Sequence, residues 1–330
     1  MTVVIAERRS EHLARQQRAD HARRFAFSDR MFASGTRVAA LLVLVLLGGI
    51  ALSLILGSVD AFRAFGLTFF TTQRWNPVTE RFGALAPIYG TVVTSLIAVL
   101  IAVPLGIGIA IFLTELCPER LKRWIGTAIE LLAGIPSIIY GIWGLFVFAP
   151  FMQVYIQPPV IAFFRGVPGL SSVFSGPPYG IGTLTASIIL AIMILPFIAS
   201  ITRDVFASVP PLLKEAAYGV GCTRWEVIRG VVIPYARVGI VGGVMLGLGR
   251  ALGETMAVTF VIGNAHRISA SLFAPGTTIS ATIANEFTES VGDLYTSSLI
   301  ALGLILFIFT FGVLALARYM LLALQRRQGA

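Results

Sequence analysis

The sequence predicts an all-α integral membrane protein with six transmembrane helices. Of its 330 residues, 56% are hydrophobic and only 12% are charged, and the mean hydropathy is +0.86. A soluble domain carries about twice that share of charged residues. Six apolar stretches are each long enough to cross about 30 Å of hydrocarbon as a helix that rises about 1.5 Å per residue. Composition and span length together argue against a soluble globular protein.

The first apolar stretch runs from Val38 to Val59 and contains no charged residue. We predict a transmembrane helix over 37–59. A cleaved signal peptide does not fit, because the apolar run is too long and the charged segment before it is too extended. The basic segment 1–36 is expected to be a disordered cytoplasmic tail.

Five further transmembrane helices are expected at about 87–115, 126–150, 181–202, 234–262 and 296–323. An even number of spans puts both chain ends on the same side of the membrane. Basic residues favour the side of the N-terminus, which predicts a multi-pass protein of the cytoplasmic (plasma) membrane with both termini in the cytoplasm. The predicted cytoplasmic segments hold Arg8, Arg9, Arg15, Arg18, Arg23, Arg24, Arg30, Arg37, Arg120, Lys122, Arg123, Arg203, Lys214, Arg224, Arg229, Arg237, Arg318, Arg326 and Arg327, and the predicted external segments hold Arg63, Arg74, Arg81, Arg165 and Arg267.

This distribution explains the net charge of +9 by topology and by contact with lipid headgroups. No aromatic or motif context supports a nucleic-acid role for the arginine-rich segment 8–37. Membrane lipid, and not nucleic acid, is therefore the expected partner of the basic residues.

The sequence offers little for enzymatic chemistry. Cys117 and Cys222 fall in segments predicted to be cytoplasmic, where thiols stay reduced. His12, His21 and His266 all lie outside the predicted spans. We therefore expect no metal site, no intramembrane histidine relay and no catalytic residue.

Nucleotide hydrolysis does not fit this chain either. A P-loop needs a lysine directly after its last glycine, and the two lysines, Lys122 and Lys214, each follow a leucine. The chain is therefore expected to be no enzyme and to bind no cofactor. Active transport through it would draw on an ion gradient or on ATP used by a partner ATPase.

The segment 203–233, between the fourth and fifth predicted spans, contains a short amphipathic helix. Pro210 and Pro211 can start a helix but cannot continue one from the preceding span. Glu215 lies near the positive N-terminal end of this helix, and the glycines that follow can end it. The apolar face is formed by Leu212, Leu213, Ala216 and Ala217, and the glycines are Gly219 and Gly221.

A second short segment, 224–232, leads from this helix to Pro234, where the fifth span is expected to begin. An amphipathic helix between two spans suits docking into a groove on a soluble partner. It also suits a helix that lies on the membrane surface.

The residues of this segment resemble a known signature. Glu215, Ala216 and Ala217, then Gly221, then Pro234 follow the EAA pattern of ABC importer permeases, E-A-A-x3-G-x9-I-x-L-P. The sequence departs from that pattern only at Val231 and Ile233, which stay apolar. In that family the signature forms coupling helices that insert into a cleft on the ATPase subunit, so the resemblance implies ATPase coupling through Glu215, Ala216, Ala217, Gly221 and Pro234.

Three other stretches are similar to the permeases of phosphate-specific importers. They begin RWNPVTERFG at residue 74, ELLAGIPSIIYGIWGL at 130 and GRALGETMAVTFVIGN at 249. The resemblance covers about residues 70–320 and implies a MetI-like permease domain over 85–325, preceded by an extra N-terminal helix. It also implies a homologous second permease subunit, two ATPase subunits inside and a phosphate-binding protein outside.

Glycines recur every four residues on the fifth predicted span, at Gly239, Gly243 and Gly247. Such a stripe lets another helix approach closely. We expect packing against the second permease there, although packing within one subunit produces the same spacing. Outside the membrane, the connections 151–180 and 263–295, with Phe164 and Glu289 as test positions, are expected to form the docking face for the binding protein.

The fifth span also holds Arg250 and Glu254 four residues apart in an otherwise apolar stretch. They form either a structural ion pair or the lining of the substrate path, where a guanidinium suits a passing oxyanion. We favour the path, with Glu254 holding Arg250 while the path is empty.

The expected function is therefore a permease subunit that carries inorganic phosphate and couples to a separate ATPase. The alternatives are an importer for another oxyanion, a proton-coupled secondary anion transporter with Glu254 as the carrier, and a membrane scaffold that transports nothing.

Overall fold

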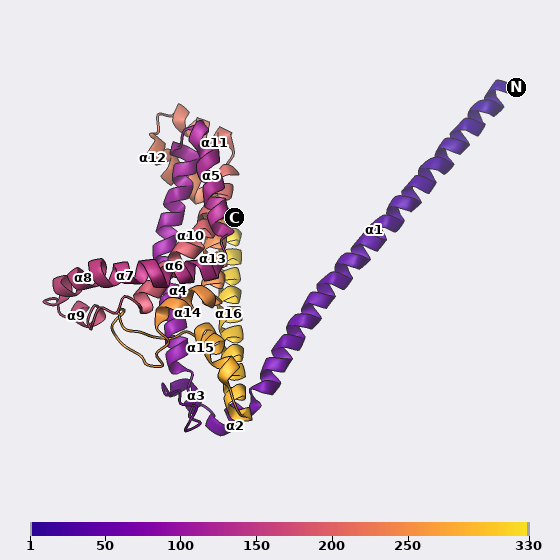
Figure 1. Cartoon of the computed structure of the whole chain (residues 1–330). Coiled ribbons are helices and arrows are strands. Elements are labelled where there is room, and N and C mark those ends of the chain that lie inside the picture. Colours follow the sequence, from indigo (N-terminus) through magenta and orange to yellow (C-terminus); the bar gives the residue numbers. More distant parts are fainter. Residues whose placement is uncertain (1, 329–330) are drawn as a thin grey trace. The chain divides into compact units, whose positions relative to one another are not determined.

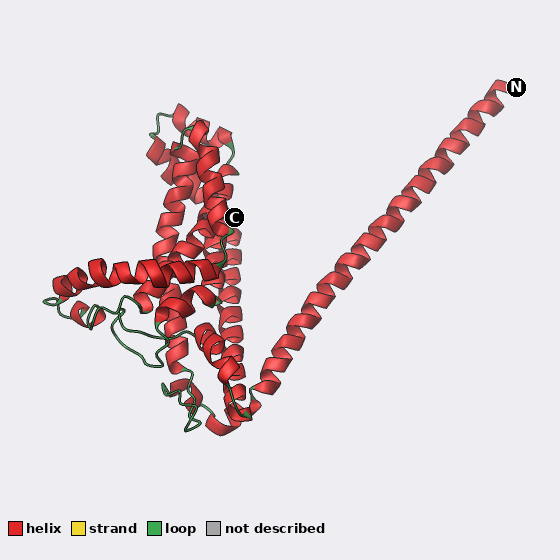
Figure 2. Cartoon of the chain, in the orientation of Figure 1, coloured by secondary structure: helices red, strands yellow, loops and turns green. Residues whose placement is uncertain are grey.

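The computed structural model describes the backbone of residues 2–328 and the side chains of residue 29 and of residues 31–323. In this part of the chain the regular structure is helical, with loops between the helices and one isolated bridge that joins Asn76 and Arg81 (Figure 2). The expected all-α class is confirmed.

The chain divides into two compact units, residues 1–56 and residues 57–330. The first unit is the long helix α1 (Thr2–Gly57), whose backbone is helical from its second residue. The expected disordered tail over 1–36 is thus replaced by a helix, because this segment has no proline and no glycine before Gly35 and is rich in the helix formers Ala, Arg, Glu and Gln. The arginine side chains from Arg8 to Arg24 lie outside the described ones.

Six helical segments of the described residues are long and apolar enough to cross a membrane, as expected. Most lie within a few residues of their predicted positions, and the third and fifth differ. The six segments are 31–65, 85–116, 137–164, 183–207, 224–252 and 293–323.

The third span differs from the expected 126–150. The chain first forms an amphipathic helix, α5 (Glu119–Ala133), and the span begins only at Ser137. Pro136 has no N–H and disfavours a helical conformation at Ile135, so α5 cannot continue through this point. The span then runs through α6 (Ser137–Trp143), η2 (Gly144–Phe148), α7 (Ala149–Phe151), η3 (Met152–Ile156) and α8 (Gln157–Phe164), so much of the expected loop over 151–180 is helical.

Helix α10 (Thr183–Ala207) lies at the centre of the second unit, packed against α4 (Leu85–Ile111), α5, α13 (Ile233–Leu252) and α14 (Met256–Ile262) (Figure 1). Its side chains Ile189, Leu190, Ile194 and Ile198 are fully buried. Without a hydrophobic driving force between helices in lipid, close van der Waals packing of this kind holds them together.

The glycine stripe of the fifth span faces α10 of the same chain. A Cβ at Gly239 would lie 2.5 Å from Val205, one at Gly243 3.0 Å from Ile201, and one at Gly247 2.8 Å from Ile198. Side chains of α10 in the same subunit therefore occupy the space beside these three glycines, which corrects the expectation that they pack against a second permease. The spacing marks a face for close approach, but it does not say which helix approaches.

The fifth span begins earlier and ends earlier than the expected 234–262. Helix α12 (Arg224–Val227) continues through η4 (Ile228–Val232) into α13, and Pro234 lies within this run. Proline has no N–H and cannot make the usual helical hydrogen bond. The π-helical turn just before Pro234 accommodates this missing bond. The run ends at Leu252, and a three-residue turn separates it from α14.

The end of the unit opposite α12 is closed by α2 (Val59–Phe65), α3 (Thr68–Thr71), α15 (Ile279–Glu286) and the start of α16 (Asp293–Gln328) (Figure 1). Here Phe69 and Phe82 are buried among aromatic and aliphatic side chains. The Oγ of Ser297 donates to the carbonyl of Gly57 over 2.7 Å and accepts from the N–H of Ala61 over 3.0 Å, which ties α2 to α16. The remaining elements are η1 (Phe112–Leu116), α9 (Leu170–Val173), α11 (Pro211–Gly219) and η5 (Phe287–Glu289).

Candidate functional site

The segment 203–233 forms two short helices at one end of the unit, next to α5 (Figure 1). Helix α11 begins at Pro211 and ends at Gly219, as the sequence predicted. The chain then turns at Gly221, whose φ of +92° is strained for any residue with a side chain. Helix α12 starts at a capping box, in which the Thr223 hydroxyl accepts from the Glu226 N–H and the Glu226 carboxylate accepts from the Thr223 N–H.

Two ion pairs hold this end together. The Nζ of Lys214 on α11 lies 2.5 Å from Oε1 of Glu115 on η1, whose side chain is only 8% exposed. A second pair joins Arg203 on α10 to Glu130 on α5 over 2.8 Å. The first pair links α11 to η1 at the end of the second membrane span, so a displacement of α11 reaches η1 directly, and the second pair links α5 to α10. Sequence reasoning missed both carboxylates, because their partners lie more than 70 positions away in the chain.

The segment 203–233 presents apolar side chains to its surroundings. Leu212 is 73% exposed, Val220 82% and Trp225 60%. Ala217 is half-buried and packs on a core cluster that includes Phe206 of α10 and Val227 of α12. Glu215 and Ala216 are exposed. On a surface outside lipid, large exposed apolar side chains gathered on one short segment mark an interaction site.

Arg250 and Glu254 lie on either side of the break in the fifth span. Arg250 is in the last turn of α13, exposed, with its guanidinium carbon 4.3 Å from the centre of the Phe197 ring. Glu254 precedes α14, and its Oε1 accepts from the N–H of Ala257 over 3.2 Å. The ion pairs between described side chains do not include one between Arg250 and Glu254.

This geometry corrects the assumption of one continuous helix with an i,i+4 pair. Gly253 ends α13, and each charge complements the helix end beside it. A cation favours the negative C-terminal end of α13, and a carboxylate favours the positive N-terminal end of α14. Broken helices whose ends meet in a bundle are common at transporter substrate sites.

At the opposite end of the unit, side-chain contacts hold part of the connection 263–295. The Tyr295 hydroxyl donates to the Glu286 carboxylate, and His266 Nε2 lies 3.5 Å from the other carboxylate oxygen. Glu289 is exposed, and Phe164 stacks on Phe174 with ring centres 4.8 Å apart. The docking role predicted for these connections stays a prediction.

Known proteins resemble this chain over most of its length. The family model described as "binding-protein-dependent transport system inner membrane component" matches residues 102–326. A protein of Mesorhizobium japonicum named "Phosphate transport system permease protein PstC" is 72% identical over 316 residues, covering 96% of this chain and 97% of that protein. A protein of the same name from Pasteurella multocida is 56% identical, covering 91% of this chain and 93% of that protein.

Solved structures agree on the fold. The permease of a bacterial alginate ABC transporter, crystallised with its alginate-bound periplasmic protein, superposes with a TM-score of 0.55 at 18% identity, covering 85% of this chain and 93% of that chain. An inward-facing MetNI methionine ABC transporter gives a TM-score of 0.53 at 17% identity, covering 72% of this chain and 94% of that chain. Identities this low bear on the fold and not on the cargo. The chain belongs to the family of binding-protein-dependent transport system inner membrane components.

Proposed function

We propose that this chain is a permease subunit of an ATP-driven importer and forms part of the translocation path for inorganic phosphate. The observation that carries the proposal is the relatives' name, phosphate transport system permease, held by proteins that are 72% and 56% identical over at least 91% of this chain. Both termini lie in the cytoplasm in this proposal, which follows the distribution of basic residues.

The proposed partners are a homologous second permease (PstA-like), two ATPase subunits (PstB-like) and an external phosphate-binding protein (PstS-like). The exposed Leu212, Val220 and Trp225 support an ATPase contact at α11 and α12, since they form an apolar surface on the segment that carries the EAA-like residues. The ion pair between Lys214 and Glu115 supports a mechanical link from that surface to the second membrane span.

Arg250 and Glu254 are proposed to act in the phosphate path as a pair of separate charges. The exposed guanidinium of Arg250 has five N–H donors and no carboxylate partner among the described side chains, so it is free to bind an oxyanion. Phe197 holds the guanidinium from one side by a cation–π contact. Glu254 keeps the break in place by capping α14 and limits how tightly an anion is held nearby.

Phosphate uptake by vesicles that contain the complete importer tests this proposal. Arg250→Gln is expected to abolish uptake while the complex assembles, and Arg237→Gln, an exposed arginine on the same helix, serves as the matched control. Glu254→Gln keeps an oxygen that accepts from Ala257 and loses only the charge. Normal uptake by Arg250→Gln would remove Arg250 from the path, and normal uptake by Glu254→Gln would reduce Glu254 to a cap.

A variant with the charges of Arg250 and Glu254 exchanged does not separate a structural pair from a path. It would put a carboxylate at the negative end of α13 and a guanidinium at the positive end of α14, which is unfavourable in either case. The proton-coupled alternative is tested by energetics instead. Uptake that persists without ATP and collapses with the proton gradient would support it, and competition by sulfate or another oxyanion would change the assigned cargo.

A further inference from the structure

The connection between α3 and α4, residues 72–84, is held in one conformation by its own hydrogen bonds. Asn76 and Arg81 exchange backbone bonds of 2.9 and 3.1 Å, and the side-chain oxygen of Asn76 accepts from the N–H groups of Val78 and Thr79. Glu80 adopts a φ of +48°, which closes the turn. We name this connection the basic loop, after its two arginines, Arg74 and Arg81.

Aromatic packing anchors the basic loop to the rest of the unit. The ring of Trp75 lies 4.9 Å from that of Phe82 and stacks on His266 at 5.4 Å, and Phe82 stacks on Tyr295 at 4.9 Å. Phe82 is 2% exposed. The inward side chains thus fix the loop, and Arg74 and Arg81, its outward side chains, are presented on a rigid support.

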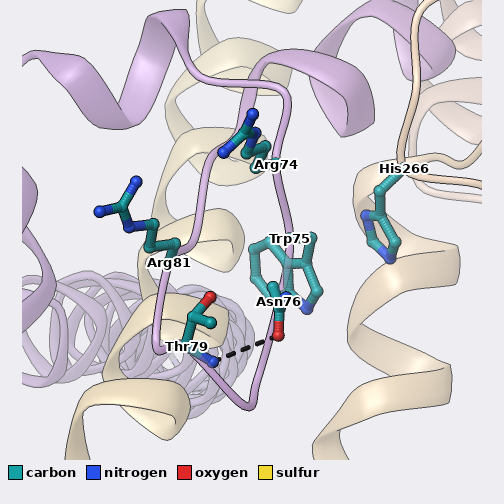
Figure 3. Close-up of a pocket in the computed structure, with 6 residues that line it drawn as sticks. All are labelled: Arg74, Trp75, Asn76, Thr79, Arg81 and His266. Carbon is teal, nitrogen blue, oxygen red and sulfur yellow. Dashed lines mark hydrogen bonds between the residues drawn. The ribbon is translucent and has the colours of Figure 1, made fainter.

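The basic loop borders a hollow of about 580 Å³ lined by Arg74, Trp75, Asn76, Thr79, Arg81 and His266. Both arginine side chains extend to the same side of the loop, and His266 approaches Trp75 from the other (Figure 3). No carboxylate is among these lining residues, and the ion pairs between described side chains include neither arginine. The nearby Glu286 is engaged by Tyr295 and His266. The hollow is therefore polar and positive.

We infer that this hollow receives an acidic segment of the external solute-binding subunit. The inference rests on the proposed function, which places this end of the unit outside the membrane and supplies that partner. Two guanidinium groups on a fixed loop match carboxylate side chains in bidentate geometry. The volume falls within the range that encloses a drug-sized ligand and far exceeds what one tetrahedral anion fills. Several side chains of a protein partner fit it better than a free phosphate does.

Docking of this kind is electrostatic, so it shows in the concentration and salt dependence of the encounter. The test uses the complete importer in lipid nanodiscs and measures ATP hydrolysis against the concentration of phosphate-loaded binding protein. The double variant Arg74→Gln/Arg81→Gln is expected to raise the half-saturating concentration of the binding protein roughly tenfold or more. Raising the salt concentration should weaken the wild type more than the variant. Arg63→Gln, an exposed arginine of α2 outside the hollow, is the matched control.

A direct measure of contact accompanies the titration. Thr79→Cys, in a background without Cys117 and Cys222, is expected to cross-link to the loaded binding protein, and Arg74→Gln/Arg81→Gln added to it should reduce the cross-linked product. Retention of the other subunits on purification shows that each variant assembles.

Three outcomes overturn the inference. If Arg74→Gln/Arg81→Gln has the same half-saturating concentration of binding protein as the wild type, the hollow has no docking role. Phosphate uptake by the wild-type complex would then still support the proposed function. A variant that hydrolyses ATP normally at saturating binding protein but moves less phosphate per ATP shows that the arginines act on the free anion. A wild-type complex that shows no phosphate-dependent hydrolysis defeats the proposed function itself.

Discussion

Substituting Gly239 by alanine tests whether the glycine stripe of α13 serves contacts within this chain. The added Cβ would lie 2.5 Å from both Cγ atoms of Val205 and 3.1 Å from its Cβ. The two shorter distances are 0.9 Å inside the 3.4 Å at which ordinary contact begins. The two methyl groups of Val205 occupy two of three staggered positions, and both of these positions face Gly239. Rotation about χ1 can empty only one of them, so a methyl group faces the new Cβ in every rotamer. Helices α10 and α13 must therefore separate.

Overpacking of this kind costs about 1–3 kcal/mol. Gly242→Ala is the matched control, because it lies on the same helix with nothing within 4 Å of the new Cβ. Both substitutions share the gain in helix propensity of about 1 kcal/mol. The difference between the two variants then isolates the contact. We expect Gly239→Ala to have a free energy of unfolding about 1–3 kcal/mol below that of Gly242→Ala, measured by denaturant titration in detergent.

The double variant Gly239→Ala/Val205→Ala completes the cycle. Removing both Cγ atoms of Val205 takes away the clash, so the double variant should be more stable than the sum of the two single changes predicts. The reasoning is refuted if Gly239→Ala and Gly242→Ala are equally stable and only Gly239→Ala loses the second permease on purification. That result would indicate that the glycine stripe of α13 packs against the second permease.

Two further predictions concern the ends of the bundle. Lys214→Ala leaves the buried Glu115 without its partner and should destabilise the docked position of α11 by about 1–3 kcal/mol. The expected readout is faster maleimide labelling of Cys222 in a Cys117→Ser background. Lys122→Ala, which breaks an exposed ion pair, is the control and should not change the labelling rate. Burial lowers the pKa of His266 against the opposing effect of Glu286, so the unfolded chain binds more protons below about pH 6.5 and stability should fall on acidification. His266→Gln should flatten this dependence in thermal melts, and an unchanged slope would assign it to another group.

Hydropathy predicts the spans well where one apolar run forms one helix, and less well where two helices share a run. Hydropathy predicts the third span over 126–150 because the apolar face of α5 and the start of α6 lie close together in the sequence. Averaging over a window hides Pro136, which stands in the three-residue connection between α5 and α6. A rule that weighs proline before hydropathy would have placed the start of the span correctly.

The local structure of the segment 203–233 is more predictable from the sequence than the contacts in the core. Proline at the start of α11, glycine at its turn and the S/T-x-x-E pattern at Thr223 are local signals, and each acts within a few residues. Local signals do not identify a distant partner. The pairing of Lys214 with Glu115 and the approach of α10 to Gly239 depend on how the helices pack, which no single stretch of sequence encodes.

Arg250 and Glu254 illustrate how one misplaced helix boundary changes a chemical interpretation. Four-residue spacing places two side chains together only if the helix is continuous. Gly253 ends α13 between them, so the two charges stabilise two helix ends and need no contact with each other. A guanidinium that is not neutralised by a neighbouring carboxylate keeps its full charge for a ligand, and the helix dipole holds it in place without occupying its N–H groups. In the proposed function, the break in the fifth span thus leaves the guanidinium of Arg250 without a carboxylate neighbour and open to an anion.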